Sequence, residues 1–282
     1  MIKQAVYGLP LNPMSLLEQL KGASFCVSYG THVKLGRQLD DAIRLVGKNR
    51  ILLVDNGAFS HWKSGGEMTE DYIEGFEVWA QDILDRCPQA VAVIPDVIGG
   101  TMEQNLELLN TSQLDPDRCM AIWHLHEPIS YLLYLCESYN YVGFGSTVDA
   151  PGSDKWHARI REAFAAIDDW EKAGEGAYIR PRLHMMRAQA YAHLYPFDTS
   201  DSTNVAMNHN RQLKKAGEDI RQFASRASAK DPQELGTGSR APDQAAAARS
   251  LADDGMAHAL VPGSRRLSRH VRRPRARRRA VA

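Results

Sequence analysis

The stretch Tyr195-Pro196-Phe197-Asp198-Thr199-Ser200-Asp201-Ser202-Thr203-Asn204 begins as an apolar, aromatic run and ends in two carboxylates and a cluster of hydroxyl groups. A buried strand that delivers acidic side chains at its carboxyl end is how parallel α/β folds present catalytic groups. We therefore expect a strand that begins near Tyr195 and carries the catalytic carboxylate Asp201. Asp198 lies three residues earlier, so a regular strand directs only one of these two carboxylates into a cavity.

Six further apolar runs precede this stretch and predict strands over residues 24–30, 50–55, 90–96, 119–125, 141–146 and 182–186. Between them, helical patterns are expected over 36–47, from Thr69, from near Thr101, from Pro128, over Asp154–Ala173 and, briefly, after 186. The runs are continuously apolar, as in strands that are buried on both faces. Alternating strands and helices imply a parallel sheet, either doubly wound or closed into a barrel.

A (β/α)8 barrel of the TIM type is the favoured α/β fold, because polar residues recur at most strand ends and must converge on one site. Residues 4–9 would supply the eighth strand or a cap. We expect the barrel domain to cover residues 1–228, with a polar helix over 208–227. Residues 229–282 are poor in aromatic residues and predict a disordered tail. The nine arginines of 265–282 fit either a basic tail or an out-of-frame read of GC-rich DNA.

The composition is that of a soluble globular enzyme, with 44% hydrophobic and 24% charged residues in a chain of 282. No apolar run is long enough for a membrane span, and the N-terminus lacks the pattern of a signal peptide. The four cysteines are far apart, which argues against a zinc ribbon or a disulfide framework. These features predict a cytoplasmic protein that has no membrane partner.

The formal net charge of zero combines two unlike parts. Without the nine arginines of 265–282, the 34 basic residues fall to 25 against 34 acidic ones, which leaves a net charge near −9. An acidic body binds nucleic acid only through a helper protein or a local basic groove. Candidates for such a groove, which would otherwise be a solvated surface, are Arg180, Arg182, Arg187, Arg211, Lys214 and Lys215.

Polar side chains at five predicted strand ends make up the candidate site: Asp55, Asp96, His124 with His126, Ser146 with Thr147, and Asp201. A single Asp after a strand is most often a helix cap or a turn former. Three such Asp, each near Gly, Ser or Asn, favour a site. His124 and His126 alternate along a strand, so at most one faces the cavity. With Glu127 they have the composition of a metal site but not its spacing, and we expect no metal.

Small and aromatic residues beside these acids suggest room for a flat ligand. Asn56 and Gly57 follow Asp55 directly and allow a ligand to approach the backbone. Gly143 and Gly145 would do the same, or would only ease packing in the strand. Phe59 and its aromatic neighbours are either core and rim packing or a stacking surface for a planar heterocycle. Paired carboxylates beside such a surface indicate displacement at a sugar carbon, with one acid as nucleophile and the other handling protons.

These residues, in this order, resemble the tRNA-guanine transglycosylase superfamily over roughly 20–210, most closely its DNA-modifying branch, the deoxypurine-in-DNA protein A (DpdA) family. Asp55-Asn56-Gly57-Ala58-Phe59-Ser60 stands where the superfamily has Asp-Ser-Gly-Gly-Phe-Gln. Tyr141-Val142-Gly143-Phe144-Gly145-Ser146 resembles its Gly-Gly-Leu-Ala-Val-Gly segment. Trp123-His124-Leu125-His126-Glu127-Pro128 replaces the strand that bears a base-binding Gln, and Pro95-Asp96-Val97 matches its base-recognising Asp.

The resemblance implies a transglycosylase that exchanges guanine in DNA for a 7-deazaguanine of the preQ0 type, with no cofactor. It makes Asp201 the nucleophile and Asp55 the general acid/base. The substrate-binding residues would be Asp96, Asn56, Gly57, Phe59, His124, His126, Gly143, Gly145, Ser146 and Asp198. The tRNA enzymes' Cys-x-Cys-x-x-Cys zinc site is missing here, which favours DNA, with a guanine flipped out of the duplex. The tRNA enzymes' Phe-Asp would instead place the nucleophile at Asp198. A nucleosidase or glycoside hydrolase, and a degenerate purine-binding or prophage-remnant protein, remain the alternatives.

Overall fold

The computed structural model of the chain describes residues 4–66, 68–145, 150–202, 219 and 222. Within these residues, strands pair in parallel and in chain order, and pairing of the last with the first closes a barrel. The expected (β/α)8 barrel is confirmed, and residues 4–8 form a strand of it rather than a cap. The strands are β1 (Gln4–Gly8), β2 (Ser24–Ser28), β3 (Leu52–Asp55), β4 (Ala90–Val93), β5 (Cys119–His124), β6 (Tyr141–Gly145), β7 (Arg182–Met185) and β8 (Thr199–Ser202).

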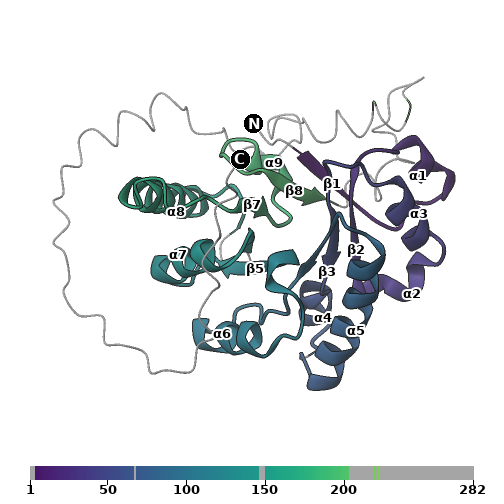
Figure 1. The fold of residues 1–282 in the computed structure, drawn as a ribbon, viewed down its shortest axis with the longest axis horizontal. Coiled ribbons are helices and arrows are strands. Elements are labelled where there is room, and N and C mark those ends of the chain that lie inside the picture. The colour runs from purple at the N-terminus through teal and green to yellow at the C-terminus, as the bar shows by residue number, and fades with distance from the viewer. Residues whose placement is uncertain (1–3, 67, 146–149, 203–218, 220–221, 223–282) are drawn as a thin grey trace. The chain divides into compact units, whose positions relative to one another are not determined.

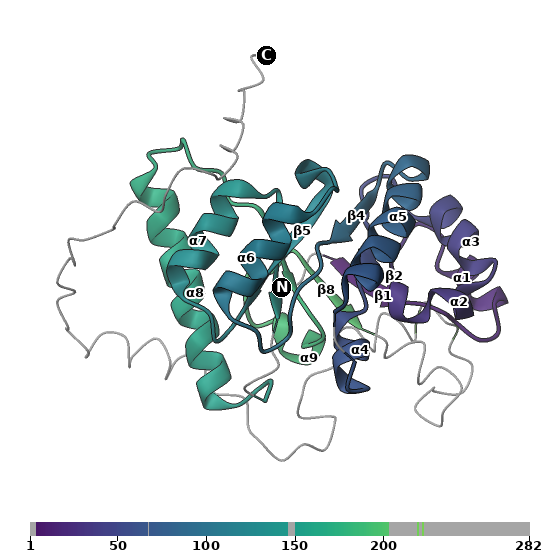
Figure 2. The same cartoon turned by 90° about the horizontal axis from the view of Figure 1, so that it is seen from below.

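Helices surround the barrel, with α6, α7 and α8 on one side and α1, α3 and α5 on the other (Figures 1 and 2). The short helices α4 and α9 follow β3 and β7 and lie at the same end of the barrel (Figure 2). The α-helices are α1 (Ser15–Gln19), α2 (His32–Leu35), α3 (Gln38–Leu45), α4 (Ala58–Lys63), α5 (Glu70–Arg86), α6 (Met102–Thr111), α7 (Ile129–Ser138), α8 (Asp154–Ala173) and α9 (Gln189–Ala192), with 3-10 turns η1 (Tyr29–Thr31) and η2 (Pro116–Arg118). Of the polar helix predicted over 208–227, the structure describes residues 219 and 222 alone, and the domain boundary at 228 and the tail lie outside the described residues.

Several helices begin where their capping residues predict. Thr69 caps α5 by accepting a hydrogen bond from the backbone N–H of Tyr72. Thr101 begins α6 with a capping box. The Thr101 hydroxyl accepts from the Gln104 backbone N–H, and the Gln104 side-chain oxygen accepts from the Thr101 backbone N–H. Each cap satisfies N–H groups that have no partner inside the helix. The helix α8 has the predicted bounds, and Ser153 caps it.

Two predicted elements are wrong in their extent. The strand expected from Tyr195 begins only at Thr199, because Tyr195 continues the turns that follow α9 with a hydrogen bond to Ala192 and because Pro196 has no N–H for a ladder. The helix expected over 36–47 is the shorter α3 (Gln38–Leu45), and a separate short helix, α2 (His32–Leu35), precedes it. The break falls at Gly36, whose φ of 51° does not fit a right-handed helix.

The interior of the barrel is filled by alternate residues of its strands. Val6, Ile51, Leu53, Val91, Val93, Met120 and Ile122 form one buried cluster. Their neighbours in sequence, such as Leu52 and Val54, belong to the larger cluster between the strands and the helices. Both sets are apolar, which explains why the strands read as continuous apolar runs. The same alternation carries Asp55 and His124 inward, as the next members of the series Ile51–Leu53 and Met120–Ile122.

We predict that Gly57→Ala destabilises the fold more than Gly65→Ala does, although both glycines have a φ near 78°. A Cβ on Gly57 would lie 2.5 Å from the backbone nitrogen of Gly30, whereas a Cβ on Gly65 meets nothing within 4 Å. Gly65→Ala should lower the free energy of unfolding by about 1–2 kcal/mol, the strain of the left-handed conformation alone. Gly57→Ala should lower it by roughly 2–4 kcal/mol. Urea unfolding measures both, and equal losses would contradict the predicted contact.

Candidate active site at the carboxyl end of the barrel

A pocket at the carboxyl end of the barrel brings together side chains from five strand ends. Its lining comprises Asp55, Asn56, Ala58, Phe59, Asp96, Ile98, Ile122, His124, Gly145, Met186 and Arg187. Six of the residues predicted from the sequence are therefore neighbours in space: Asp55, Asn56, Phe59, Asp96, His124 and Gly145. Asp201 joins them because Arg187, which lines the pocket, donates its backbone N–H to the Asp201 carboxylate.

Asp55 is the last residue of β3 and sits in the turn that leads into α4. Its carboxylate accepts a hydrogen bond of 3.2 Å from the backbone N–H of Gly57. Burial raises the pKa of Asp55 above its usual value, and the negative charges of Asp201 and Asp96 add to this. A hydrogen bond from Ser28 and the charge of Arg187 oppose the increase without cancelling it. Asp55 is therefore the carboxyl group of the pair that more readily holds a proton.

Asp201 lies on β8 in an environment that stabilises its charge. Burial alone would raise its pKa, but hydrogen bonding and charge from His184 and the backbone N–H of Arg187 outweigh burial, and the pKa is lowered. His184 Nε2 is 3.2 Å from Asp201 Oδ1, and the Arg187 nitrogen is 2.8 Å from the same oxygen. His184 is held in turn by Thr199, whose Oγ1 lies 2.7 Å from His184 Nδ1. Asp201 is thus an ionised carboxylate in a fixed orientation.

The two carboxyl groups therefore differ in proton affinity although they are close enough for the charge of Asp201 to act on Asp55. Environments that push the pKa values of two neighbouring acids apart separate a proton donor from a nucleophile or charge stabiliser. Asp55 has the raised pKa of a proton donor, and Asp201 has the lowered pKa of a nucleophile or charge stabiliser.

Asp96 follows β4 and is held by partners on both of its carboxylate oxygens. Asn56 Nδ2 donates to Asp96 Oδ1 at 2.8 Å, and His124 Nε2 lies 3.0 Å from Asp96 Oδ2. Asn56 also donates to the carbonyl of Ile94, so β3 and β4 are tied together at this end. The arrangement fixes the direction in which Asp96 presents its remaining lone pairs to the pocket.

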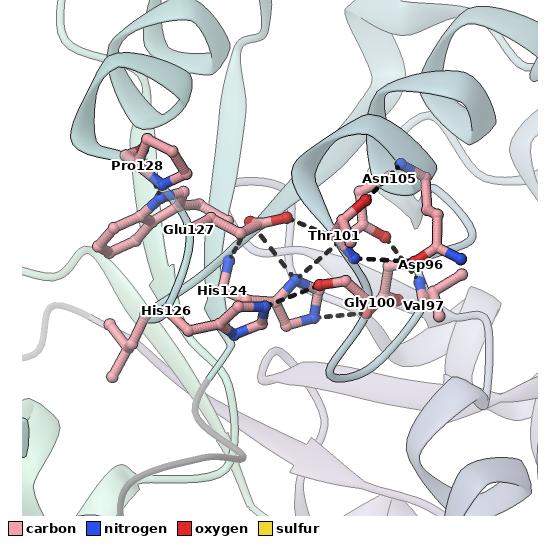
Figure 3. Close-up of polar contacts among 12 residues, drawn as sticks. Asp96, Val97, Gly100, Thr101, Asn105, His124, His126, Glu127 and Pro128 are labelled. Carbon is pink, nitrogen blue, oxygen red and sulfur yellow. Dashed lines mark hydrogen bonds and ion pairs between the residues drawn. The ribbon is translucent and has the colours of Figure 1, made fainter.

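His124 connects Asp96 to a second buried acid, Glu127 (Figure 3). Glu127 accepts hydrogen bonds from the His124 backbone N–H at 2.7 Å and from Asn105 Nδ2 at 2.8 Å. Burial would lower the pKa of His124, but its hydrogen bonds to Asp96 and Glu127 raise the pKa to about 9. At neutral pH the ring is therefore an imidazolium between two carboxylates, which keeps this charged cluster paired although it is buried.

The remaining predicted residues that the structure describes do not line the pocket. His126 is exposed beyond β5, with Nε2 2.8 Å from the carbonyl oxygen of Gly100 (Figure 3). A Cβ on Gly143 would meet the side chains of Ile122 and Met120, so this glycine eases packing in the barrel interior. Asp198 precedes β8, and its carboxylate accepts the backbone N–H of Leu183 at 3.0 Å. Ser146 and Thr147 lie outside the described residues.

Gly57 and Gly145 allow neighbouring groups to pack closely because they have no side chain. Gly57, which caps α4 in a left-handed conformation, packs against the backbone of Gly30. A Cβ on Gly145 would come within 2.9 Å of the His124 ring. The absence of a side chain at Gly145 therefore gives His124 its place beside Asp96.

Sequence reasoning missed His184, Asn105 and the role of Glu127 as a partner of His124. His184 had a detectable signal, since it is a polar residue inside the apolar run of β7, where only an interior partner can satisfy it. Glu127 stood out only for its place beside the two histidines, and Asn105 had no signal. Asn105 lies inside α6, and helix residues reach the site only through tertiary packing.

The basic groove predicted from sequence does not form as one group among the described residues. Arg180 is bound by Asp168 and Glu171. Arg182 lies at the start of β7, at the opposite end of the barrel, over the Tyr141 ring. Arg187 alone of the described candidates lines the pocket, and Arg211, Lys214 and Lys215 lie outside the described residues.

A search of the described residues finds no group of three or more His, Cys, Asp or Glu that could hold a metal ion. None of the described helices combines the length and the apolar character needed to cross a membrane. Comparison of the chain with protein-family models, with curated proteins and with solved structures gives no match. Fold and site together define a (β/α)8-barrel protein with a carboxylate and histidine pocket at the carboxyl ends of its strands.

We predict that stability falls as the pH rises from about 6.5 to about 9, because folding raises the pKa of His124. The stabilisation is fully present below the unfolded pKa of 6.5 and is lost as the pH passes about 9. Urea unfolding of the wild type across this range should show a loss on the order of 3 kcal/mol.

The same measurement on His124→Asn should give a protein that is less stable at pH 6.5 and lacks most of this pH dependence. The matched control is His126→Asn, which removes an exposed ring next to the cluster and should leave the pH dependence intact. A pH dependence that is equal in the wild type and in His124→Asn would show that His124 is not the titrating group.

Proposed function

We propose that the protein is a base-exchange transglycosylase that replaces guanine in DNA with a 7-deazaguanine of the preQ0 type, through a covalent intermediate on Asp201. The observation that carries the proposal is the pair Asp55 and Asp201. Asp55 lines the pocket, Asp201 accepts a hydrogen bond from the pocket residue Arg187, and the two environments move the two pKa values in opposite directions. Base exchange at a sugar carbon needs one group that remains an ionised nucleophile and one that gives and takes a proton.

In the proposed first step, the target nucleotide is flipped out of the duplex, because C1′ is not accessible inside the base stack. The Asp201 carboxylate attacks C1′, the bond from C1′ to the guanine ring nitrogen breaks, and the leaving guanine takes the Asp55 proton. The Arg187 backbone N–H and His184 both contact Asp201 Oδ1 and so orient the carboxylate. In the second step, Asp55 accepts the proton of the incoming deazaguanine. The ring nitrogen of that base then attacks C1′ and releases Asp201.

Recognition of the base is assigned to Asp96. Its two oxygens each accept one bond within the protein, from Asn56 and from His124, and each keeps a further lone pair. A guanine-like edge offers a ring N–H and an amino group side by side, which matches two carboxylate oxygens. The imidazolium of His124, 3.0 Å from Asp96 Oδ2, holds that oxygen in place beside the pocket.

The test compares Asp201→Asn with Asp198→Asn in a DNA exchange assay that uses labelled preQ0. Asp201→Asn should lower exchange by at least about a thousandfold, because an amide is a poor nucleophile. Asp198→Asn keeps an oxygen that can accept the Leu183 N–H, so it should exchange at close to the wild-type rate. Loss of exchange in Asp198→Asn alone would overturn the assignment of the nucleophile.

Mass spectrometry of the reaction products separates this proposal from its rivals. Release of guanine without incorporation of preQ0 would identify a nucleosidase or glycoside hydrolase, in which water takes the place of the incoming base. Binding of preQ0 that depends on Asp96, together with no turnover by the intact protein, would identify a purine-binding protein. Incorporation into tRNA and not into DNA would overturn the choice of substrate.

A further inference from the structure

Arg187 occupies a constrained position at the edge of the pocket. It follows β7 with a φ of 64°, a left-handed conformation that residues other than glycine rarely adopt. Its backbone N–H donates to Asp201 Oδ1 at 2.8 Å. The backbone N–H of Arg187 therefore binds the carboxylate of the proposed nucleophile. The left-handed conformation that makes this bond also fixes the direction of the Cα–Cβ bond of Arg187.

The side chain of Arg187 lies across the ring of Phe59. The guanidinium carbon is 3.5 Å from the ring centroid, and both residues line the pocket. The residue is exposed, and among the described residues its side chain forms no ion pair. One face of an aromatic ring accommodates one planar group, so a base that stacks on this face of Phe59 must displace the guanidinium toward the pocket mouth.

We propose that Arg187 binds a phosphate group next to the deoxyribose that is attacked, an inference that rests on the proposed function. The phosphates on either side of a nucleotide are attached to the same sugar whose C1′ must reach Asp201. An exposed cationic side chain that lines the pocket and starts one hydrogen bond away from Asp201 is therefore placed beside that backbone. The planar guanidinium presents paired N–H donors that match phosphate oxygens.

Electrostatics makes such a cation necessary. The negative charges of Asp96 and Asp201, which raise the pKa of Asp55, also repel a phosphate backbone. His124 is already paired with two of the buried acids, and Arg180 is committed to ion pairs elsewhere. Of the described basic residues in the predicted groove, Arg187 is left to receive the phosphate.

The experiment measures the salt dependence of DNA binding with the full chain, in the Asp201→Asn background so that no exchange occurs. The probe is a duplex of A·T pairs with one central G·C pair. Loss of one phosphate contact lowers the slope of log K against log salt by about 1. Arg187→Gln should show this decrease and bind on the order of tenfold more weakly at low salt. Its backbone N–H remains available to residue 201.

Two further variants control for charge and for structure. Arg182→Gln removes the same charge and a similar arginine–aromatic contact five residues away, at the other end of the barrel, and should leave the slope unchanged. Arg187→Lys keeps the charge without the planar fork and should restore the slope but only part of the affinity. Equal slopes for Arg187→Gln and its parent would overturn the inference, as would an equal decrease in Arg182→Gln.

A neutral methylphosphonate in place of either phosphate that flanks the guanosine provides the complementary change in the DNA. At one of these two positions, the methylphosphonate should weaken DNA binding by the parent protein. The same methylphosphonate should not weaken DNA binding by Arg187→Gln any further. Equal additional losses in both proteins would also overturn the inference. Failure of the proposed function can be told apart from failure of this inference by a separate exchange assay. If the proposed function is wrong, the wild-type protein will not exchange guanine for preQ0 in this duplex.

Discussion

The parallel pairing of β8 with β1 is the interaction on which the site depends. It closes the barrel and sets Asp201 opposite Val6 in the register. Because side chains alternate along each strand, closure in this register directs Asp201 to the interior and leaves Asp198 at the backbone of β7. A shift of one residue would exchange the two faces and remove the carboxylate from the pocket. The choice between the two acids is therefore made by the ladder and not by either side chain.

The polar floor of the pocket is built by continuing the same alternation beyond the apolar core. Below it, the barrel interior is a cluster of apolar side chains. Nearer the carboxyl end, the inward positions become Asp55, His124 and Asp201, while His184 lies level with Ile122 in the register. The buried polar side chains of this layer are kept by mutual hydrogen bonds, which is the condition under which buried charge is tolerated.

Two separate clusters result, and they divide the chemistry that we propose. Around Asp201, a histidine and a backbone N–H stabilise the negative charge of the carboxylate. Around Asp96, an imidazolium and an amide hold a carboxylate that can read a base edge. Asp55 feels the charges of both Asp96 and Asp201. The hydrogen bond from Ser28 and the charge of Arg187 do not offset its burial, so its pKa is raised. Arg187 is the described cation that faces both Asp55 and Asp201, which is why its side chain is the natural contact for a phosphate.

The sequence by itself determined the fold class, because continuous apolar runs that alternate with capped helices admit few architectures, and polar strand ends favoured the closed one. It also identified Asp55, Asp96, His124 and Asp201 by their position after those runs. Only the tertiary structure decided the partners. His184 meets Asp201 across β7 and β8, and Asn105 reaches Glu127 from a helix. Such contacts depend on register and on helix packing, which join residues that are far apart in the chain and leave no local pattern.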